Sequence, residues 1–121
     1  MTHGVFTVPV LINGTVQLEF LLDTGASDVV LPADVIRTLI RTGTLSQEDV
    51  IGVSKYVLAD GSRGENLQLR LQEVTIGDRT VNDVTASSAP MQGVPLLGQS
   101  FLARFGSWAI DNRRQVLVLS P

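Results

Sequence analysis

The chain has 121 residues, 44% of them hydrophobic and 17% charged, with a formal net charge of −3. This length and composition predict one globular domain, residues 1–121, with a hydrophobic core of its own. The acidic balance and the scattered lysines and arginines argue against a nucleic-acid partner, because phosphate binding requires clustered basic side chains.

The numbers of cysteines and histidines exclude further kinds of active site. The chain has no cysteine, and His3 is its only histidine. Disulfide bonds and thiolate chemistry are therefore excluded, and neither a transition-metal site nor a histidine-dependent triad is expected. No apolar run approaches the roughly 20 residues of a membrane-spanning helix. A membrane tether or export signal outside this fragment stays an open alternative.

The N-terminal quarter predicts a β-hairpin that leads into a third strand. Weak alternation of apolar and polar residues indicates strands over residues 4–12 and 15–22, and the Asn-Gly pair at 13–14 is a strong hairpin signal. The second strand stops at the Asp-Thr-Gly of residues 23–25, and apolar residues resume at 29–31.

A short amphipathic helix is predicted next. Pro32 suits the first helical position, Asp34 suits the positive end of the helix dipole, and Gly43 is a typical stop. The expected apolar stripe consists of Val35, Ile36, Leu39 and Ile40. Residues 46–49 then predict a capped helical turn.

The second half predicts further strands joined by turns. Strand character over 53–59 precedes a polar tip at 60–64, and leucines at 67, 69 and 71 alternate with polar residues. The apolar face then shifts by one residue, which predicts a bulge near 72–73. A returning strand is expected at 81–86.

The C-terminal third predicts a loop, a helix and a last hairpin. The loop spans 89–95, and the helix spans 99–105 after Leu-Leu-Gly at 96–98. The hairpin pairs residues 107–110 with 115–119. Many short strands with one or two short helices predict an all-β fold, a small barrel or sandwich.

The Asp-Thr-Gly segment carries the strongest chemical signal. A lone carboxylate between two core segments is costly to bury unless something pairs with it, and Gly25 allows backbone N–H groups to approach Asp23. One carboxylate makes a poor hydrolase, whereas two that share a proton can both activate water and protonate an amine. A two-fold homodimer is expected to supply the second Asp23. The alternative is an ordinary turn in which Asp23 caps its own backbone.

Three motifs, in order, resemble the retropepsin-like aspartic peptidases, most closely their bacterial single-domain branch. They are the Leu-Asp-Thr-Gly-Ala-Ser loop at 22–27, a flap hairpin at 56–64, and Leu-Leu-Gly at 96–98 followed by a helix. The resemblance runs from about Val5 to Leu119. It implies an acid-protease barrel that acts as a homodimer on peptide or protein substrates, without cofactor or metal, in a bacterial periplasmic or membrane-anchored setting.

The resemblance also implies roles for individual residues. Asp23 would be catalytic, Thr24 and Gly25 would support the active-site loop, and Thr24 would bridge the two loops of the dimer. The implied substrate contacts come from the loop and the flap tip: Ala26, Ser27, Asp28, Ala59, Asp60, Gly61 and Ser62.

The chain departs from the viral pattern in three places. A serine, Ser27, stands where a first acid is usual, the flap tip is charged at Asp60 and Arg63, and a whole hairpin at 107–119 replaces one short dimerising strand. The first alternative function is therefore a weak or inactive peptide-binding or dimerisation module on the same fold. A purely structural β domain is the second. Loss of cleavage on replacing Asp23 with Asn would favour the enzyme over the first alternative, and a chain that stays monomeric at high concentration would favour the second.

Overall fold

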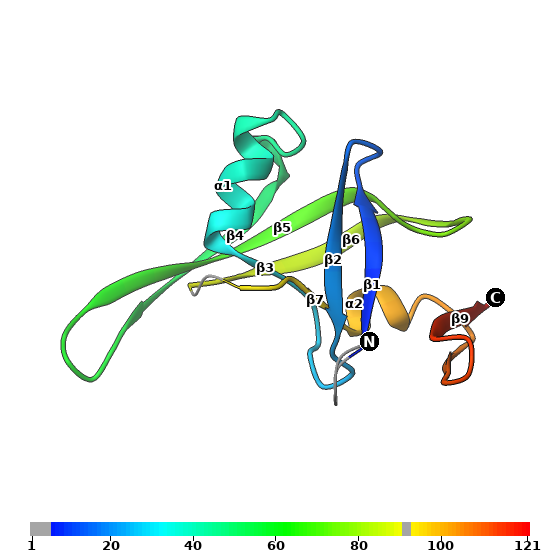
Figure 1. The fold of residues 1–121 in the computed structure, drawn as a ribbon. Coiled ribbons are helices and arrows are strands. Elements are labelled where there is room, and N and C mark those ends of the chain that lie inside the picture. The colour runs from blue at the N-terminus through cyan, green and yellow to red at the C-terminus, as the bar shows by residue number, and fades with distance from the viewer. Residues whose placement is uncertain (1–5, 91–92) are drawn as a thin grey trace.

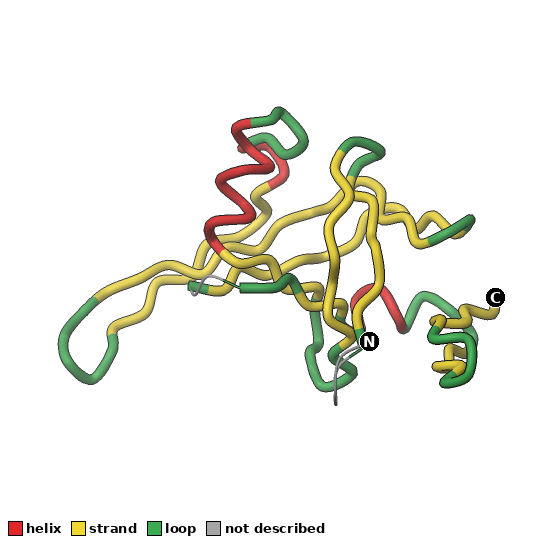
Figure 2. Tube along the Cα trace, in the orientation of Figure 1, coloured by secondary structure: helices red, strands yellow, loops and turns green. Residues whose placement is uncertain are grey.

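The computed structural model describes residues 6–90 and 93–121, which fold mainly as β-strands with short helices (Figures 1 and 2). Residues 4 and 5 of the first predicted strand lie outside this range. The elements in chain order are β1 (Thr7–Ile12), β2 (Val16–Leu22), β3 (Val29–Pro32), α1 (Ala33–Arg41), η1 (Gln47–Asp49), β4 (Val50–Val57), β5 (Arg63–Ile76), β6 (Arg79–Ala89), β7 (Leu96–Leu97), α2 (Gln99–Leu102), β8 (Ser107–Asp111) and β9 (Val116–Ser120).

Most strands join one sheet, in the order β1-β2-β7-β3-β6-β5-β4. β1 also pairs with β5 in antiparallel fashion, so the sheet curls until its first strand meets its sixth. Two of the pairings, β2 with β7 and β3 with β6, are parallel. The predicted all-β class is confirmed, and the short β7 lies between β2 and β3 in the sheet.

The first hairpin forms as the Asn-Gly signal predicts. Asn13 and Gly14 have φ angles of 50° and 67°, the positive values that a type I′ turn requires at both central positions. The backbone N–H of Thr15 donates to the carbonyl of Ile12 at 3.0 Å, closing the turn.

The helices follow the sequence signals with two differences. In α1, Ile36 and Leu39 are buried as predicted, but Ile40 is 40% exposed, because the helix packs through a narrower stripe. The capped turn at residues 46–49 is confirmed as η1. The predicted helix at 99–105 is wrong in length, because after Leu102 the backbone N–H groups of Arg104 and Phe105 bond three residues back and form turns.

A bulge near residues 72–73 would change the pairing register of β5 with β6, and the structure shows no such change. This prediction is therefore also wrong. Leu71 pairs with Val84 and Glu73 pairs with Asn82, so β5 and β6 keep one register. The buried face shifts where Val74 of β5 also pairs with β1. The register shift of the β4–β5 hairpin instead falls early in β4, near residues 50–52.

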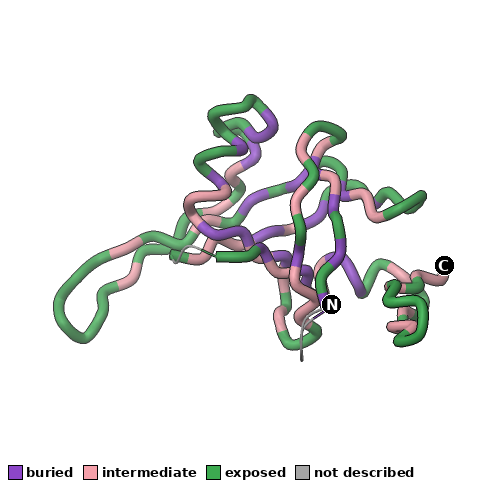
Figure 3. Tube along the Cα trace, viewed as in Figure 1, coloured by how far each residue is buried: buried purple, intermediate pink, exposed green. Residues whose placement is uncertain are grey.

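The buried residues that form the core come mainly from the strands of the large sheet, from α1 and from α2 (Figure 3). Its largest fully buried side chains include Phe20, Leu31, Leu97 and Phe101. Leu97 pairs with Leu22 at the end of β2, so these buried side chains lie next to the start of the loop. This packing positions the loop that connects β2 to β3.

Two hairpins extend from this body. The long β4–β5 hairpin projects to one side in Figure 1, with an exposed tip at residues 58–62 (Figure 3). The C-terminal β8–β9 hairpin, confirmed as predicted, forms a separate two-stranded sheet. Within residues 6–90 and 93–121, none of the helices is long and apolar enough to cross a membrane.

Candidate active site

The loop between β2 and β3, residues 23–28, crosses the end of β7. It must do so because β7 lies between its two flanking strands in the sheet. The backbone N–H of Asp23 donates to the carbonyl of Leu97 at 3.0 Å, which anchors the start of the loop. The candidate acid therefore sits at the edge of the buried core, on a rigid strand end.

Gly98 packs against the inner side of this loop. A β-carbon at this position would overlap the carbonyl oxygen of Asp28 and lie 2.7 Å from that of Ala26. These are backbone atoms of an anchored loop, so they cannot move aside as a flexible side chain would. The Leu-Leu-Gly motif therefore needs its glycine for close approach of two backbone segments.

Residues at the start of α2 make four further hydrogen bonds, which hold the loop and tie its far end to β6. The backbone N–H of Gln99 donates to the Ala26 carbonyl at 2.9 Å, and its side-chain Nε2 donates to the Thr24 carbonyl at 3.0 Å. Ser100 Oγ accepts from the N–H of Val29 at 2.8 Å and donates to the Thr85 carbonyl at 2.6 Å. Together these contacts fix both ends of the loop to the sheet.

The carboxylate of Asp23 is half-buried and points along its own loop. Its Oδ1 accepts a hydrogen bond from the N–H of Gly25 at 3.1 Å, as the sequence predicts. Thr24 and Gly25 are exposed on the outer side of the loop. Within the described ranges, no salt bridge reaches Asp23 and no three metal-binding side chains gather into a site.

The remaining loop residues differ in their environment. Ala26 is half-buried and Ser27 is exposed. Asp28 is half-buried, and its Oδ2 accepts a hydrogen bond from Ser87 Oγ at 2.6 Å. Because Ser87 lies on β6, this bond ties the end of the loop to a second strand.

The predicted flap tip is a tight, exposed turn. The N–H of Leu58 donates to the Ser62 carbonyl at 2.7 Å, and Gly61 adopts a φ of 85°. Asp60 Oδ1 accepts hydrogen bonds from the Oγ of Ser62 at 2.6 Å and from its N–H at 2.9 Å. These hydrogen bonds lower the pKa of Asp60; the Ser62 hydroxyl has the largest effect and the Ser62 N–H the second largest. Ala59 is exposed beside them.

A scan against protein families matches residues 8–104 to the family described as "gag-polyprotein putative aspartyl protease". The chain belongs to this family. A retropepsin-like aspartic protease from Rickettsia conorii is similar in structure, with a TM-score of 0.63 and 25% identity over 93% of this chain and 88% of that one. A comparison with curated protein sequences gives no match.

Two further solved structures share the retropepsin-like fold. The retroviral protease-like domain of Ddi1 from Leishmania major has a TM-score of 0.58 at 17% identity, covering 95% of this chain and 87% of that one. EIAV protease complexed with the inhibitor HBY-793 has a TM-score of 0.57 at 23% identity, covering 91% and 96%. The retropepsin-like assignment made from the three sequence motifs is therefore confirmed.

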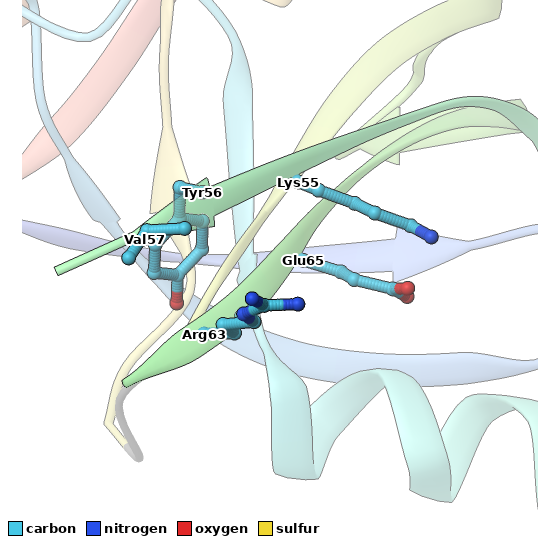
Figure 4. Close-up of a pocket in the computed structure, with 6 residues that line it drawn as sticks. Lys55, Tyr56, Val57, Arg63 and Glu65 are labelled. Carbon is cyan, nitrogen blue, oxygen red and sulfur yellow. The ribbon is translucent and has the colours of Figure 1, made fainter. Parts of the chain in front are cut away.

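The shaft of the β4–β5 hairpin carries a cavity of about 400 Å³ (Figure 4). The ring of Tyr56 on β4 lies against Gly64 on β5, where any β-carbon would overlap it. In Figure 4, Lys55 and Glu65 project side by side from the paired strands. The cavity does not include Asp23, so the structure places it apart from the candidate acid.

Sequence reasoning missed three residues that organise the candidate site: Ser87, Gln99 and Ser100. No turn signal or periodicity marks them. The one available hint is that Gln99 and Ser100 directly follow Leu-Leu-Gly, where polar side chains at the start of a helix can reach a neighbouring loop.

Proposed function

We propose that this chain is an aspartic endopeptidase that acts as a homodimer, with Asp23 of each protomer as the catalytic residue. The observation that carries the proposal is the anchoring of the Asp23 loop on the core. The Asp23 N–H donates to the Leu97 carbonyl, and Gly98 and Gln99 hold the loop backbone, none of which an ordinary exposed turn requires. Membership of the aspartyl protease family supports the same reaction class.

The proposed chemistry needs two carboxylates that share one proton. The ionised Asp23 takes a proton from water as the oxygen attacks the scissile carbonyl carbon, while the protonated Asp23 donates a hydrogen bond to the carbonyl oxygen. The tetrahedral intermediate then breaks its C–N bond, and a carboxyl proton passes to the leaving amine. One described protomer supplies one such loop, so the second acid comes from the partner.

The surrounding residues fit supporting roles. Thr24 and Gly25 are exposed on the outer side of the loop, which suits contact with the partner loop and with an extended peptide. Asp28 has one oxygen bonded to Ser87 and is proposed to contact substrate, as are Ala26 and Ser27. The flap-tip residues Ala59, Asp60, Gly61 and Ser62 are proposed to close over the peptide and exclude water.

Digestion of a mixed peptide library by wild type and Asp23→Asn, across pH, tests the proposal. Wild type should cleave and Asp23→Asn should not. Asp78→Asn is the matched control, because the Asp78 side chain is 97% exposed and reaches Arg79 only at 4.0 Å. Cleavage that survives in Asp23→Asn would place the site elsewhere. A wild type that binds peptides without cleaving them would favour the inactive binding module.

Mixing the two proteins tests the dimer directly. If one active site needs two intact copies of Asp23, only dimers of two wild-type chains are active. After subunit exchange, an equal mixture of wild type and Asp23→Asn should then have about a quarter of the activity of the same total concentration of wild type. If each chain carries a complete site, about half survives. Cleavage activity that rises linearly with the fraction of wild type would therefore contradict an active site shared between two protomers.

A further inference from the structure

A single peptide unit of the loop is held at both of its ends. The carbonyl of Thr24 accepts a hydrogen bond from Gln99 Nε2 at 3.0 Å. The N–H of Gly25, which belongs to the same planar peptide group, donates to Asp23 Oδ1 at 3.1 Å. Gln99 and the carboxylate of Asp23 are therefore connected through one rigid group.

The geometry of a trans peptide makes this connection directional. Its C=O and N–H point in opposite directions, so a donor that fixes the carbonyl also fixes the direction of the N–H. Hydrogen bonds in such a chain also polarise one another. The Gln99 amide should therefore both aim the Gly25 N–H at the carboxylate and strengthen its interaction with the negative charge.

Gln99 is itself well placed to act as an anchor. Its backbone N–H donates to the carbonyl of Ala26 at 2.9 Å, and it follows the closely packed Gly98. The side chain therefore extends from a fixed point at the start of α2. The sequence separation of 75 residues between Gln99 and Thr24 shows that only the tertiary fold brings them together.

We propose that Gln99 is a positioning residue for Asp23, acting through the Thr24–Gly25 peptide. The inference rests on the proposed function, because it assigns Gln99 the task of aiming a donor at the Asp23 carboxylate before substrate arrives. Gln99 need not touch the substrate for this role. Its loss should slow the chemical step while leaving peptide binding nearly unchanged.

Kinetics of two Gln99 variants give the first test. Gln99→Met keeps the length of the side chain and removes the donor, so kcat should fall about three- to tenfold with KM within about twofold. Gln99→Glu places a carboxyl group there that can donate only when protonated. The activity of Gln99→Glu relative to Gln99→Met should therefore rise as pH falls through about 4.

Gln17→Met is the matched control. Gln17 is exposed on β2 and makes no side-chain hydrogen bond to any other residue that the structure describes. It should leave kcat and KM unchanged. Equal kcat values for wild type and Gln99→Met, with Asp23→Asn inactive, would overturn the inference and leave the proposed function standing. An increase in KM alone would also overturn it.

The amide resonance of Gly25 gives a second test that needs no activity. Asp23→Asn should move the Gly25 ¹H resonance, because it replaces the carboxylate oxygen that this N–H bonds in wild type. In Gln99→Met the Gly25 proton should shift upfield, because its hydrogen bond weakens, whereas Gln17→Met should leave it in place. An unmoved Gly25 resonance in Gln99→Met would contradict the inference even if the protein cleaves nothing.

Discussion

Gly98 and Asp28 approach through their backbones so closely that a single methyl group on Gly98 would overlap the Asp28 carbonyl oxygen. This contact joins the segment after β7 to the loop after β2. It explains why a glycine must follow the two leucines, and it holds the backbone of the loop against the core while the outer residues of the loop stay exposed.

Gly98→Ala should therefore destabilise the fold, by about 3 kcal/mol or more, because overpacking against fixed backbone forces the loop away from the core. Urea denaturation followed by near-UV circular dichroism measures the change. Gly77→Ala serves as the control. Gly77 has a φ of 59° but no atom within 4 Å of the added carbon, so only backbone strain of about 1 kcal/mol is expected. Equal effects at both positions would refute the packing argument.

Gly25→Ala should behave in the opposite way. An added β-carbon would meet only Asp23 Oδ1, at the ordinary contact distance of 3.4 Å, so the free energy of unfolding of the protomer should change by less than about 1 kcal/mol. Peptide cleavage should nevertheless be lost, because the exposed loop surface is where the partner loop and substrate are proposed to approach. Full activity in Gly25→Ala would argue that nothing approaches this surface closely.

Ser100→Ala should cost about 1–3 kcal/mol of stability, because it leaves the N–H of Val29 and the carbonyl of Thr85 without their shared partner. Both bonds are short, at 2.8 and 2.6 Å, and the site is half-buried. Thermal and urea unfolding measure the loss. Ser107→Ala, at an exposed position of β8, should change stability by less than about 0.5 kcal/mol.

The turn at the tip of the β4–β5 hairpin should depend on pH through Asp60. The Ser62 hydroxyl lowers the pKa of Asp60 below the ordinary value of 3.8. A pKa lowered in the folded state means that the ionised form stabilises the turn; this stabilisation is present above the ordinary pKa and is lost as pH falls through the lowered one. The tip should therefore loosen only in strong acid.

Ser62→Ala should move the pKa of Asp60 back toward 3.8, because it removes the largest contribution to the shift. Carboxyl ¹³C NMR titration measures this directly. Ser54→Ala, on the exposed shaft of the same hairpin, should leave the Asp60 titration unchanged. An Asp60 titration that is the same in Ser62→Ala and wild type would show that the turn geometry does not depend on the hydroxyl.

Local chemistry made much of the fold predictable. Asn13 and Gly14 tolerate positive φ, so they placed the first turn, and the glycine at position 43 ends the helix with a φ of 76°. The Asp-Thr-Gly loop and the Leu-Leu-Gly segment were recognisable in order along the chain. The length of α2 and the exposure of Ile40 were not predictable, because they depend on which neighbours each residue packs against.

The sequence by itself determined where most turns fall and which of the longer strands form, and it singled out Asp23 as the candidate catalytic residue. Those features depend on backbone preferences and apolar spacing within a few residues. Only the tertiary structure decided which side chains hold the acid in place, because Ser100 and Gln99 reach their loop partners across 71 and 75 residues of sequence. Such contacts exist only after the sheet has folded back on itself and brought the end of β7 beneath the loop.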